Sequence, residues 1–180
     1  MRLMLKPLVA LTLLLLMAAP ARADSSVQTK RDPKGDVKLY PSRTISTAEK
    51  KSIDIDRATI TKRGNGTYRF GIRLKKLSRS ARWDQMVAFD SGNGQSDPRY
   101  GQIAFRVRNS AGASAYNAST GAVCHLSVRR KGRTVRVDVP ARCAPYGGQR
   151  IRVSAYTGYW QTDAPLFSRD RLAMGRFSVA

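Results

Sequence analysis

Residues 67–77 read TYRFGIRLKKL, and this stretch decides the fold. Apolar side chains occupy every second position from Tyr68 to Leu74, while Arg69 and Arg73 fall between them. Successive side chains of a β-strand point to opposite faces of the sheet. The period of two therefore predicts a strand with one buried face and one charged face.

Runs of the same kind lie on both sides of this stretch and are separated by short turns rich in Gly, Asn and Asp. They cover residues 52–63, 86–90, 101–109, 123–130, 133–140, 149–160 and 174–180. The pattern predicts one all-β domain of about eight or nine antiparallel strands, folded as a β-sandwich of jelly-roll or immunoglobulin-like type. Only 47–51 and 79–86 have the composition for a helical turn or two.

The first 23 residues predict a signal peptide. Arg2 and Lys6 precede an apolar run over 8–19, and Ala21-Arg22-Ala23 supplies the small residues that signal peptidase requires. The run is too short to span about 30 Å of hydrocarbon, and no other segment resembles a membrane span, so we expect no stable membrane insertion. The sequence predicts a secreted, extracellular protein, with cell-wall association left open. We expect 24–36 to be a loose lead-in and 37–180 the sandwich domain.

Cys124 and Cys143 are the two cysteines of the chain, and they flank two alternating runs around a turn at Lys131-Gly132. An even number of cysteines in an exported protein favours a disulfide. A bridge at the open end of a hairpin is also geometrically reasonable. The sequence predicts a Cys124–Cys143 disulfide, with the pair joining the ends of one hairpin.

Positive charge is the most extreme property of the sequence. The chain has 33 Lys and Arg against 12 Asp and Glu, and removing the predicted signal peptide takes away three of the basic residues, which leaves 30 − 12 = +18. Such a charge attracts polyanions and non-specific nucleic acid, although it also keeps a protein soluble through self-repulsion. Both explanations stay open at this point.

Many arginines fall on the outward phase of the predicted strands, and the guanidinium group suits bidentate binding of phosphate or carboxylate. The candidate polyanion-binding residues are Arg69, Arg73, Arg106, Arg108, Arg129, Arg136, Arg150 and Arg152. Aromatic side chains near the last of them offer stacking surfaces for a sugar or a base. These are Tyr156, Tyr159 and Trp160.

No residue set in the sequence argues for catalysis, and we expect a non-enzymatic protein. His125 is the single histidine, and alternation points it to solvent. Asp54 and Asp56 are two apart on a predicted strand, as paired glycosidase carboxylates could be, but in so basic a chain we expect them to pair with Arg or Lys.

The motif DPKGDV at 32–37 resembles the DPxGD opening of secreted sandwich domains related to carbohydrate-binding modules, such as DOMON-like and glucodextranase C-terminal-like domains. The chain after the predicted signal peptide also resembles small secreted actinobacterial proteins of unknown function, which share this opening, a central acidic loop and a late cysteine hairpin ending in VPxxC. The matching residues here are Asp32, Gly35, Asp36, Asp90, Gly94, Asp97, Tyr100 and VPARC at 139–143. The resemblance implies a sandwich fold and sugar or calcium binding. Two departures are Gly92, where an acidic residue is usual, and Arg99.

The loop FDSGNGQSDPRYG at 89–101 is the one compact stretch that could hold calcium, which takes about six to eight oxygen ligands. Asp90, Asn93 and Asp97 would supply some of them, and the resemblance implies that Asp36 or Asp56 completes the site. The spacing does not match a calcium-loop consensus, so a structural turn is the alternative. Apart from this calcium, no cofactor is expected.

Two functional hypotheses follow. The first is a binding module for anionic or carbohydrate polymers of a cell envelope, which expects Arg69, Arg73, Arg106 and Arg108 on one face. The second is a structural or protein-interaction domain whose charge serves solubility and whose partner is another extracellular protein, with an apolar patch near 156–160. An extracellular hydrolase is a distant third.

Overall fold

The structure is a computed structural model that describes residues 25–32, 35–39, 46–77, 84–93, 95–107, 112–158 and 168–177. The predicted signal peptide lies outside the described residues. Three of the candidate binding residues, Arg108, Tyr159 and Trp160, also lie outside them.

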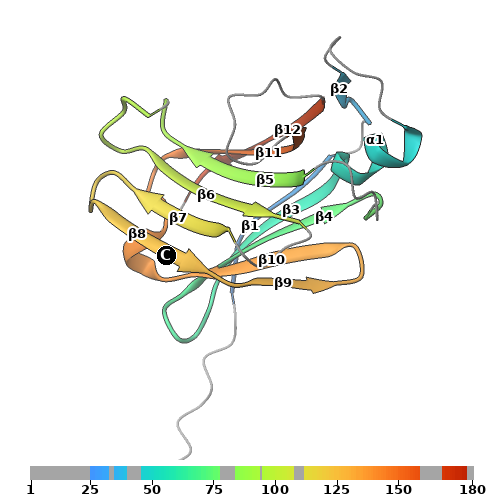
Figure 1. Ribbon diagram of the computed structural model, residues 1–180. Helices are drawn as coiled ribbons and strands as arrows, with labels where there is room; N and C mark the ends of the chain where they lie inside the picture. The colour runs from blue at the N-terminus through green and yellow to red at the C-terminus, as the bar shows by residue number, and fades with distance from the viewer. Residues whose placement is uncertain are drawn as a thin grey trace, which may run out of the picture.

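Two antiparallel sheets form a sandwich, which confirms the predicted fold class (Figure 1). Sheet A has the strand order β1 (Ser25–Arg31), β3 (Ile55–Lys62), β4 (Tyr68–Leu74), β10 (Thr134–Val139) and β9 (Val128–Lys131). Sheet B has the order β2 (Lys38–Leu39), β12 (Ser168–Arg176), β11 (Arg150–Gly158), β5 (Asp84–Ser91), β6 (Gly101–Arg106), β7 (Ala113–Asn117) and β8 (Ala122–Leu126).

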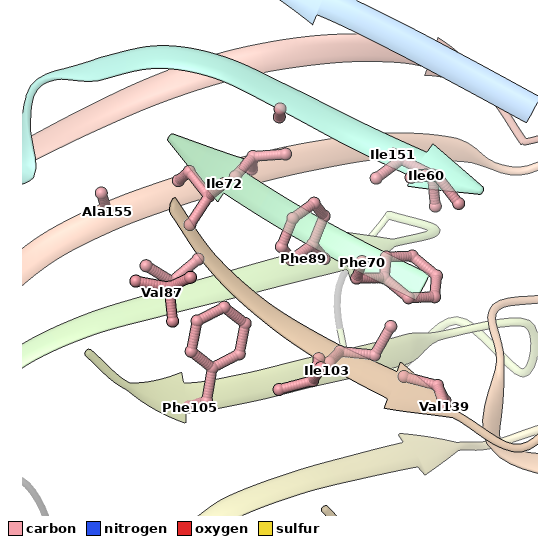
Figure 2. Packing of buried hydrophobic residues seen from close by; sticks show 14 of the residues in the cluster. Ile60, Phe70, Ile72, Val87, Phe89, Ile103, Phe105, Val139, Ile151 and Ala155 are labelled. Atoms are coloured by element: carbon pink, nitrogen blue, oxygen red, sulfur yellow. The ribbon is translucent and has the colours of Figure 1, made fainter. Parts of the chain in front are cut away.

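The alternating apolar side chains of both sheets meet in one core (Figure 2). Phe70 of β4 packs edge to face against Phe89 of β5, with ring centroids 5.2 Å apart, and Phe105 of β6 stacks on the other side of Phe89. All three rings are fully buried. The period of two in 67–77 thus directs one half of β4 into the core and leaves the other half, with its arginines, on the outer face of sheet A.

The strand count and the first boundary differ from the sequence prediction. The described residues contain twelve strands rather than eight or nine. The short edge strand β2 carries little apolar pattern, and the run predicted at 123–130 divides into β8 and β9. The expected loose lead-in at 24–36 is a second error, since β1 occupies most of it and pairs with β3. An edge strand is held by backbone hydrogen bonds on one side, so it forms without an alternating apolar run.

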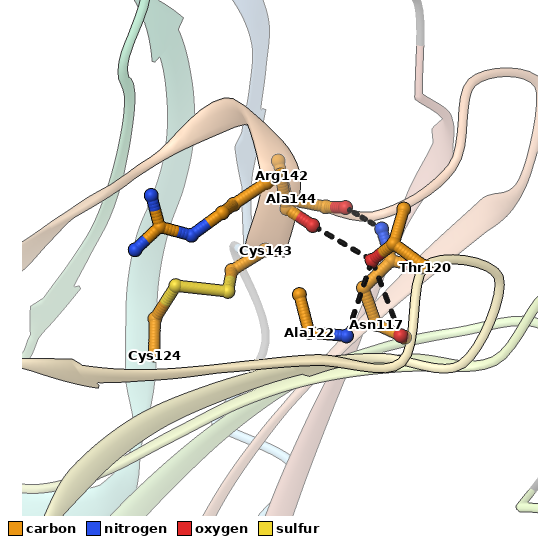
Figure 3. The surroundings of a disulfide bond; sticks show 7 residues. All are labelled: Asn117, Thr120, Ala122, Cys124, Arg142, Cys143 and Ala144. Atoms are coloured by element: carbon orange, nitrogen blue, oxygen red, sulfur yellow. Dashed lines mark hydrogen bonds between the residues drawn. A yellow bond between two sulfur atoms is a disulfide. The ribbon is translucent and has the colours of Figure 1, made fainter.

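The cysteine hairpin is also different from the prediction. The chain changes sheet at Ser127, so that β8 with Cys124 belongs to sheet B while the β9–β10 hairpin belongs to sheet A. The disulfide itself is confirmed: Cys124 joins Cys143 in the short helix η1 (Ala141–Cys143), which follows β10 (Figure 3). The bridge therefore links an edge of sheet B to the end of a sheet A strand instead of closing one hairpin.

Hydrogen bonds around the disulfide hold the same junction (Figure 3). The Asn117 side chain donates to the Ala144 carbonyl at 2.6 Å, and the Thr120 hydroxyl donates to the Arg142 carbonyl at 2.9 Å. Both bonds join the β7–β8 turn to the segment around η1, so the turn and the bridge fix the same two chain segments.

Helix α1 (Thr47–Ile53) covers the expected helical turn at 47–51. Among the described residues, no helix has the length and apolar content needed to cross a membrane.

Candidate anion-binding surface

The outer face of sheet A carries a dense group of basic side chains. Strand register places directly opposite residues on the same face, and these registers align the basic residues of five adjacent strands. The members are Arg31, Arg57, Arg69, Arg73, Arg129, Lys131 and Arg136. Neighbouring strands are about 4.8 Å apart, so the group forms a continuous basic surface, which we call the sheet A basic face.

Arginines stand directly opposite arginines at several points of this face. Arg57 of β3 is opposite both Arg31 of β1 and Arg73 of β4, and Arg136 of β10 is opposite Arg129 of β9. Like charges in directly opposite positions destabilise a sheet, and opposite charges would stabilise it. Packing and folding therefore do not account for this arrangement.

Acidic residues neutralise only part of the sheet A basic face. Asp56 pairs with Arg73 at 2.9 Å. Asp138 accepts two hydrogen bonds from Arg69, at 2.8 and 3.1 Å, and lies 3.3 Å from Arg63. The Arg69 guanidinium accordingly lowers the pKa of Asp138. Seven basic residues against these two carboxylates leave 7 − 2 = +5 on the face.

The centre of the face is a shallow depression of about 160 Å³. Gly71 forms its floor, because this outward position of β4 has no side chain, and Arg57 and Arg73 stand beside it with Thr134. The Nε atoms of Arg57 and Arg136 are buried and have no hydrogen-bond partner in the part of the chain that the structure describes. Arg57 and Arg73 thus place two guanidinium groups beside the open space of the depression.

The structure divides the predicted arginines between the two sheets. Arg69, Arg73, Arg129 and Arg136 lie on the sheet A basic face, whereas Arg106, Arg150 and Arg152 lie on sheet B. The expectation that Arg106 shares a face with Arg69 and Arg73 is therefore wrong. Alternation shows only that a side chain points away from the core. A sandwich has two outer faces, one on each sheet, and alternation does not tell on which of them a side chain lies.

The outer face of sheet B is more mixed in charge. Asp90 of β5 stands opposite Arg152 of β11 and Gln102 of β6. Gln102 donates to Asp90 at 2.9 Å, and the Tyr100 hydroxyl donates to the same oxygen at 3.4 Å. Burial raises the pKa of Tyr100 to about 12, and the neighbouring Asp90 contributes. Among the predicted stacking residues, Tyr156 is described, and it is half-buried on this sheet with a pKa that burial raises.

The predicted calcium ligands do not come together. Asp97 pairs with Arg99 at 3.3 Å and accepts the backbone N–H of Asn93 at 3.1 Å. Asp56 is on sheet A with Arg73, and Asp90 is bound by Gln102 and Tyr100. Hydrogen bonds within the 89–101 loop therefore make it a structural turn. The short-range spacing of acidic residues could not show which partner each of them takes.

Asp36 instead belongs to a different acidic group. Its carboxylate, with those of Asp32 and Asp170, forms the one group of three metal-capable side chains within the described ranges, with ligand atoms within 4.8 Å of one another. Burial raises the pKa of Asp170 to about 7. These three could contribute to a hard-cation site, although calcium would need additional oxygen ligands. Asp32 and Asp36 are the two aspartates of the DPKGD motif, so the sequence pointed to two members of this group. No motif in the sequence pointed to Asp170.

Residues with catalytic potential are dispersed in the described part of the chain. Asp54 pairs with Lys75 at 3.0 Å, and Asp56 pairs with Arg73, as expected for carboxylates in a basic protein. His125 is exposed on β8, next to the half-cystine Cys124.

Comparison with protein-family models, curated proteins and solved structures gives no match for this chain. The resemblance to carbohydrate-binding-module-like sandwiches stays a prediction. The function is therefore inferred from the charges and the geometry of this chain.

Proposed function

We propose that this protein is a secreted, non-enzymatic module that binds an anionic polymer of a cell envelope through the sheet A basic face. The observation that carries the proposal is the set of directly opposite arginine pairs centred on Arg57. An arrangement that opposes folding and persists on one face is typical of a functional site. A polyanion would remove the repulsion by placing negative charge between the arginines.

The shape of the face supports a polymer rather than a small ligand. Basic residues extend across all five strands of sheet A, from Arg31 on one edge strand to Lys131 on the other. Successive phosphate, sulfate or carboxylate groups along a polymer could contact successive strands. Each contact would release counterions, so binding should weaken steeply with salt.

The proposed location follows from two independent features. The N-terminal sequence has the pattern of a signal peptide. The disulfide between Cys124 and Cys143 fits an oxidising compartment. Both features support secretion, where envelope polymers are accessible.

Retention on immobilised polyanion tests the proposal. The protein without residues 1–23 would be applied to heparin and to polyglycerol phosphate, and eluted with increasing sodium chloride. The double variant Arg57→Gln/Arg136→Gln should elute at lower salt, with the slope of log K against log salt reduced by about two. The matched control Arg130→Gln/Arg142→Gln removes the same charge from exposed positions outside the face.

Equal losses in the two double variants would contradict a specific face and would show that net charge alone drives retention. Binding to double-stranded DNA that matches binding to the envelope polymers would show a non-specific polyanion effect.

One observation favours protein interaction as a second candidate function. Tyr116 of β7 stands opposite Val123 of β8, and both side chains are exposed. They form a small apolar pair at the edge of sheet B, away from the sheet A basic face. Retention that is insensitive to salt, lost in Tyr116→Ser/Val123→Ser and unchanged in Arg57→Gln/Arg136→Gln would favour this alternative.

A further inference from the structure

We propose that a pocket beside sheet B binds a single sulfate or phosphate group through Arg99, Arg150 and Arg176. The pocket has a volume of about 330 Å³ and also includes Asn93 and Gln149. It is formed by the loop between β5 and β6, the turn before β11 and the end of β12. This site is separate from the sheet A basic face and does not depend on the function proposed for that face.

Two of the three arginines are neighbours in the sheet. Arg150 of β11 is directly opposite Arg176 of β12, which is another like-charge pair that opposes folding. Arg176 donates from Nη1 to the Gly148 carbonyl at 3.1 Å, which holds its guanidinium beside the turn before β11. The pair therefore presents two positive charges at one end of the pocket wall.

The 89–101 loop supplies the third arginine. Asp97 accepts the backbone N–H groups of Asn93 and Arg99, at 3.1 and 2.9 Å, and also contacts the Arg99 side chain. These hydrogen bonds lower the pKa of Asp97. Gly92 has φ +78°, and a Cβ there would lie 3.1 Å from the Asp97 carboxylate, so this close turn needs glycine. The 89–101 loop, which suggested a calcium site in sequence, thus holds the positively charged side chain of Arg99 at the pocket.

The lining of the pocket is rich in hydrogen-bond donors and favours an anion with many acceptors. The polar side chains of the pocket are three guanidinium groups and two amides, and none of the lining residues is acidic. With Asp97 counted against Arg99, the local charge is 3 − 1 = +2. Sulfate and dianionic phosphate match this charge and offer acceptors in all directions.

The size of the pocket limits how much of a ligand it holds. Sites for drug-sized molecules usually measure about 300–1,000 Å³, so this pocket is at the small end of the range. One tetrahedral oxyanion fills only part of this volume, so the pocket can hold the free ion or an ester together with the adjoining part of a larger molecule, but not an extended polymer.

NMR titration of the ¹⁵N-labelled protein tests the site directly. The probes are sodium sulfate, sodium phosphate and glucose 6-phosphate, each compared with sodium chloride at matched ionic strength. Saturable shifts should appear at the amides of Gly92, Asn93 and Gly148. Loss of charge-assisted hydrogen bonds in Arg150→Gln/Arg176→Gln should weaken binding about tenfold or more.

Arg99→Gln provides a second variant, which changes a loop residue and leaves both strands intact. Arg130→Gln/Arg142→Gln is the control, because it removes two charges from exposed positions outside the pocket and outside the sheet A basic face, and it should leave the titration unchanged. Glucose 6-phosphate that binds at least as tightly as phosphate would identify an ester group as the ligand, and binding confined to the inorganic ions would identify the free anion. Shifts that are linear, equal in chloride or unaltered in both pocket variants would overturn the proposal.

Discussion

Arg57 lies directly opposite Arg73 in sheet A, and Asp56, the residue before Arg57, pairs with Arg73 at 2.9 Å. The register shifts between Ile55 and Arg57, which leaves Asp56 as an extra residue in β3. The bulge neutralises one arginine of the opposed pair and leaves the Nε of the other without a hydrogen-bond partner among the described residues. The guanidinium of Arg57 therefore keeps its charge beside the depression at the centre of the outer face.

Replacing Arg57 should separate stability from binding. Arg57→Gln removes a like charge from two cross-strand pairs, so the free energy of unfolding should rise by about 0.2–1 kcal/mol. The same change should lower the salt concentration at which the protein leaves a heparin column. Urea unfolding and column elution, with Arg130→Gln as the control, measure the two effects. A variant that is less stable and still binds fully would contradict the role given to Arg57.

Filling the central depression should weaken binding without changing charge. A Cβ on Gly71 would lie 2.8 Å from the Thr59 hydroxyl, so the substitution is best made with Thr59→Ala. We expect Thr59→Ala/Gly71→Val to fold as Thr59→Ala does and to bind polyanion several-fold more weakly, with an unchanged salt slope. Equal affinity in the two proteins would show that the depression has no part in binding.

Removing the disulfide should destabilise the junction between the sheets. Cys124 and Cys143 are 19 residues apart, and a closed loop of this length contributes about 3 kcal/mol under the chain-entropy model. Cys124→Ser/Cys143→Ser should lose about this amount in urea unfolding. Dithiothreitol should destabilise the native protein similarly and leave the variant unaffected. An effect of the reductant on the variant would point to another cause.

Asp170 should make stability depend on pH. Burial raises its pKa to about 7 in the folded protein, above the value of about 3.9 in an unfolded chain. Between about pH 4 and pH 7 the folded state therefore binds more protons than the unfolded state, and this group makes stability fall as pH rises. Asp170→Asn should remove that fall, and the free energy of unfolding across pH 4–8 measures it. Parallel pH profiles for the two proteins would show that folding does not raise the pKa of Asp170.

Replacing Asp97 tests whether this residue positions Arg99. If charge alone mattered, every neutral variant of Asp97 would bind an anion more tightly. Asp97→Asn keeps one oxygen, which can still accept the backbone N–H of Arg99, loses the second oxygen that accepts from Asn93, and removes a negative charge near the pocket. We expect it to bind sulfate at least as tightly as the native protein. Asp97→Ala removes the acceptor as well, which frees Arg99, so binding should weaken. The NMR titration compares them, and tighter binding by both variants would refute the positioning role.

The local sequence pattern predicted the architecture well, because a strand that buries one face has an apolar residue at every second position. The side chains from Tyr68 to Leu74 alternate in sequence, and the apolar ones are buried. Cys124 and Cys143 were paired correctly, since two cysteines allow one bridge. The edge strand β1 was missed because backbone pairing with β3 requires no apolar pattern.

The candidate sites were predicted less completely. The arginines of the sheet A basic face were identified as outward, apart from Arg57, whose run alternates imperfectly, and Arg31, which lies in the segment predicted as a loose lead-in. Asp32 and Asp170 form their group through a contact between residues 138 positions apart (170 − 32), which local spacing does not encode.

The sequence by itself determined that this chain forms an all-β sandwich with one disulfide and a strongly basic surface. Those properties depend on composition and on the period of two, which are local. Only the tertiary structure decided that Arg57 faces Arg73, that Arg106 lies on the other sheet, and that Arg99 and Arg150 line one pocket. Such relations depend on strand order and register, which are set by packing across the whole core rather than by any one segment.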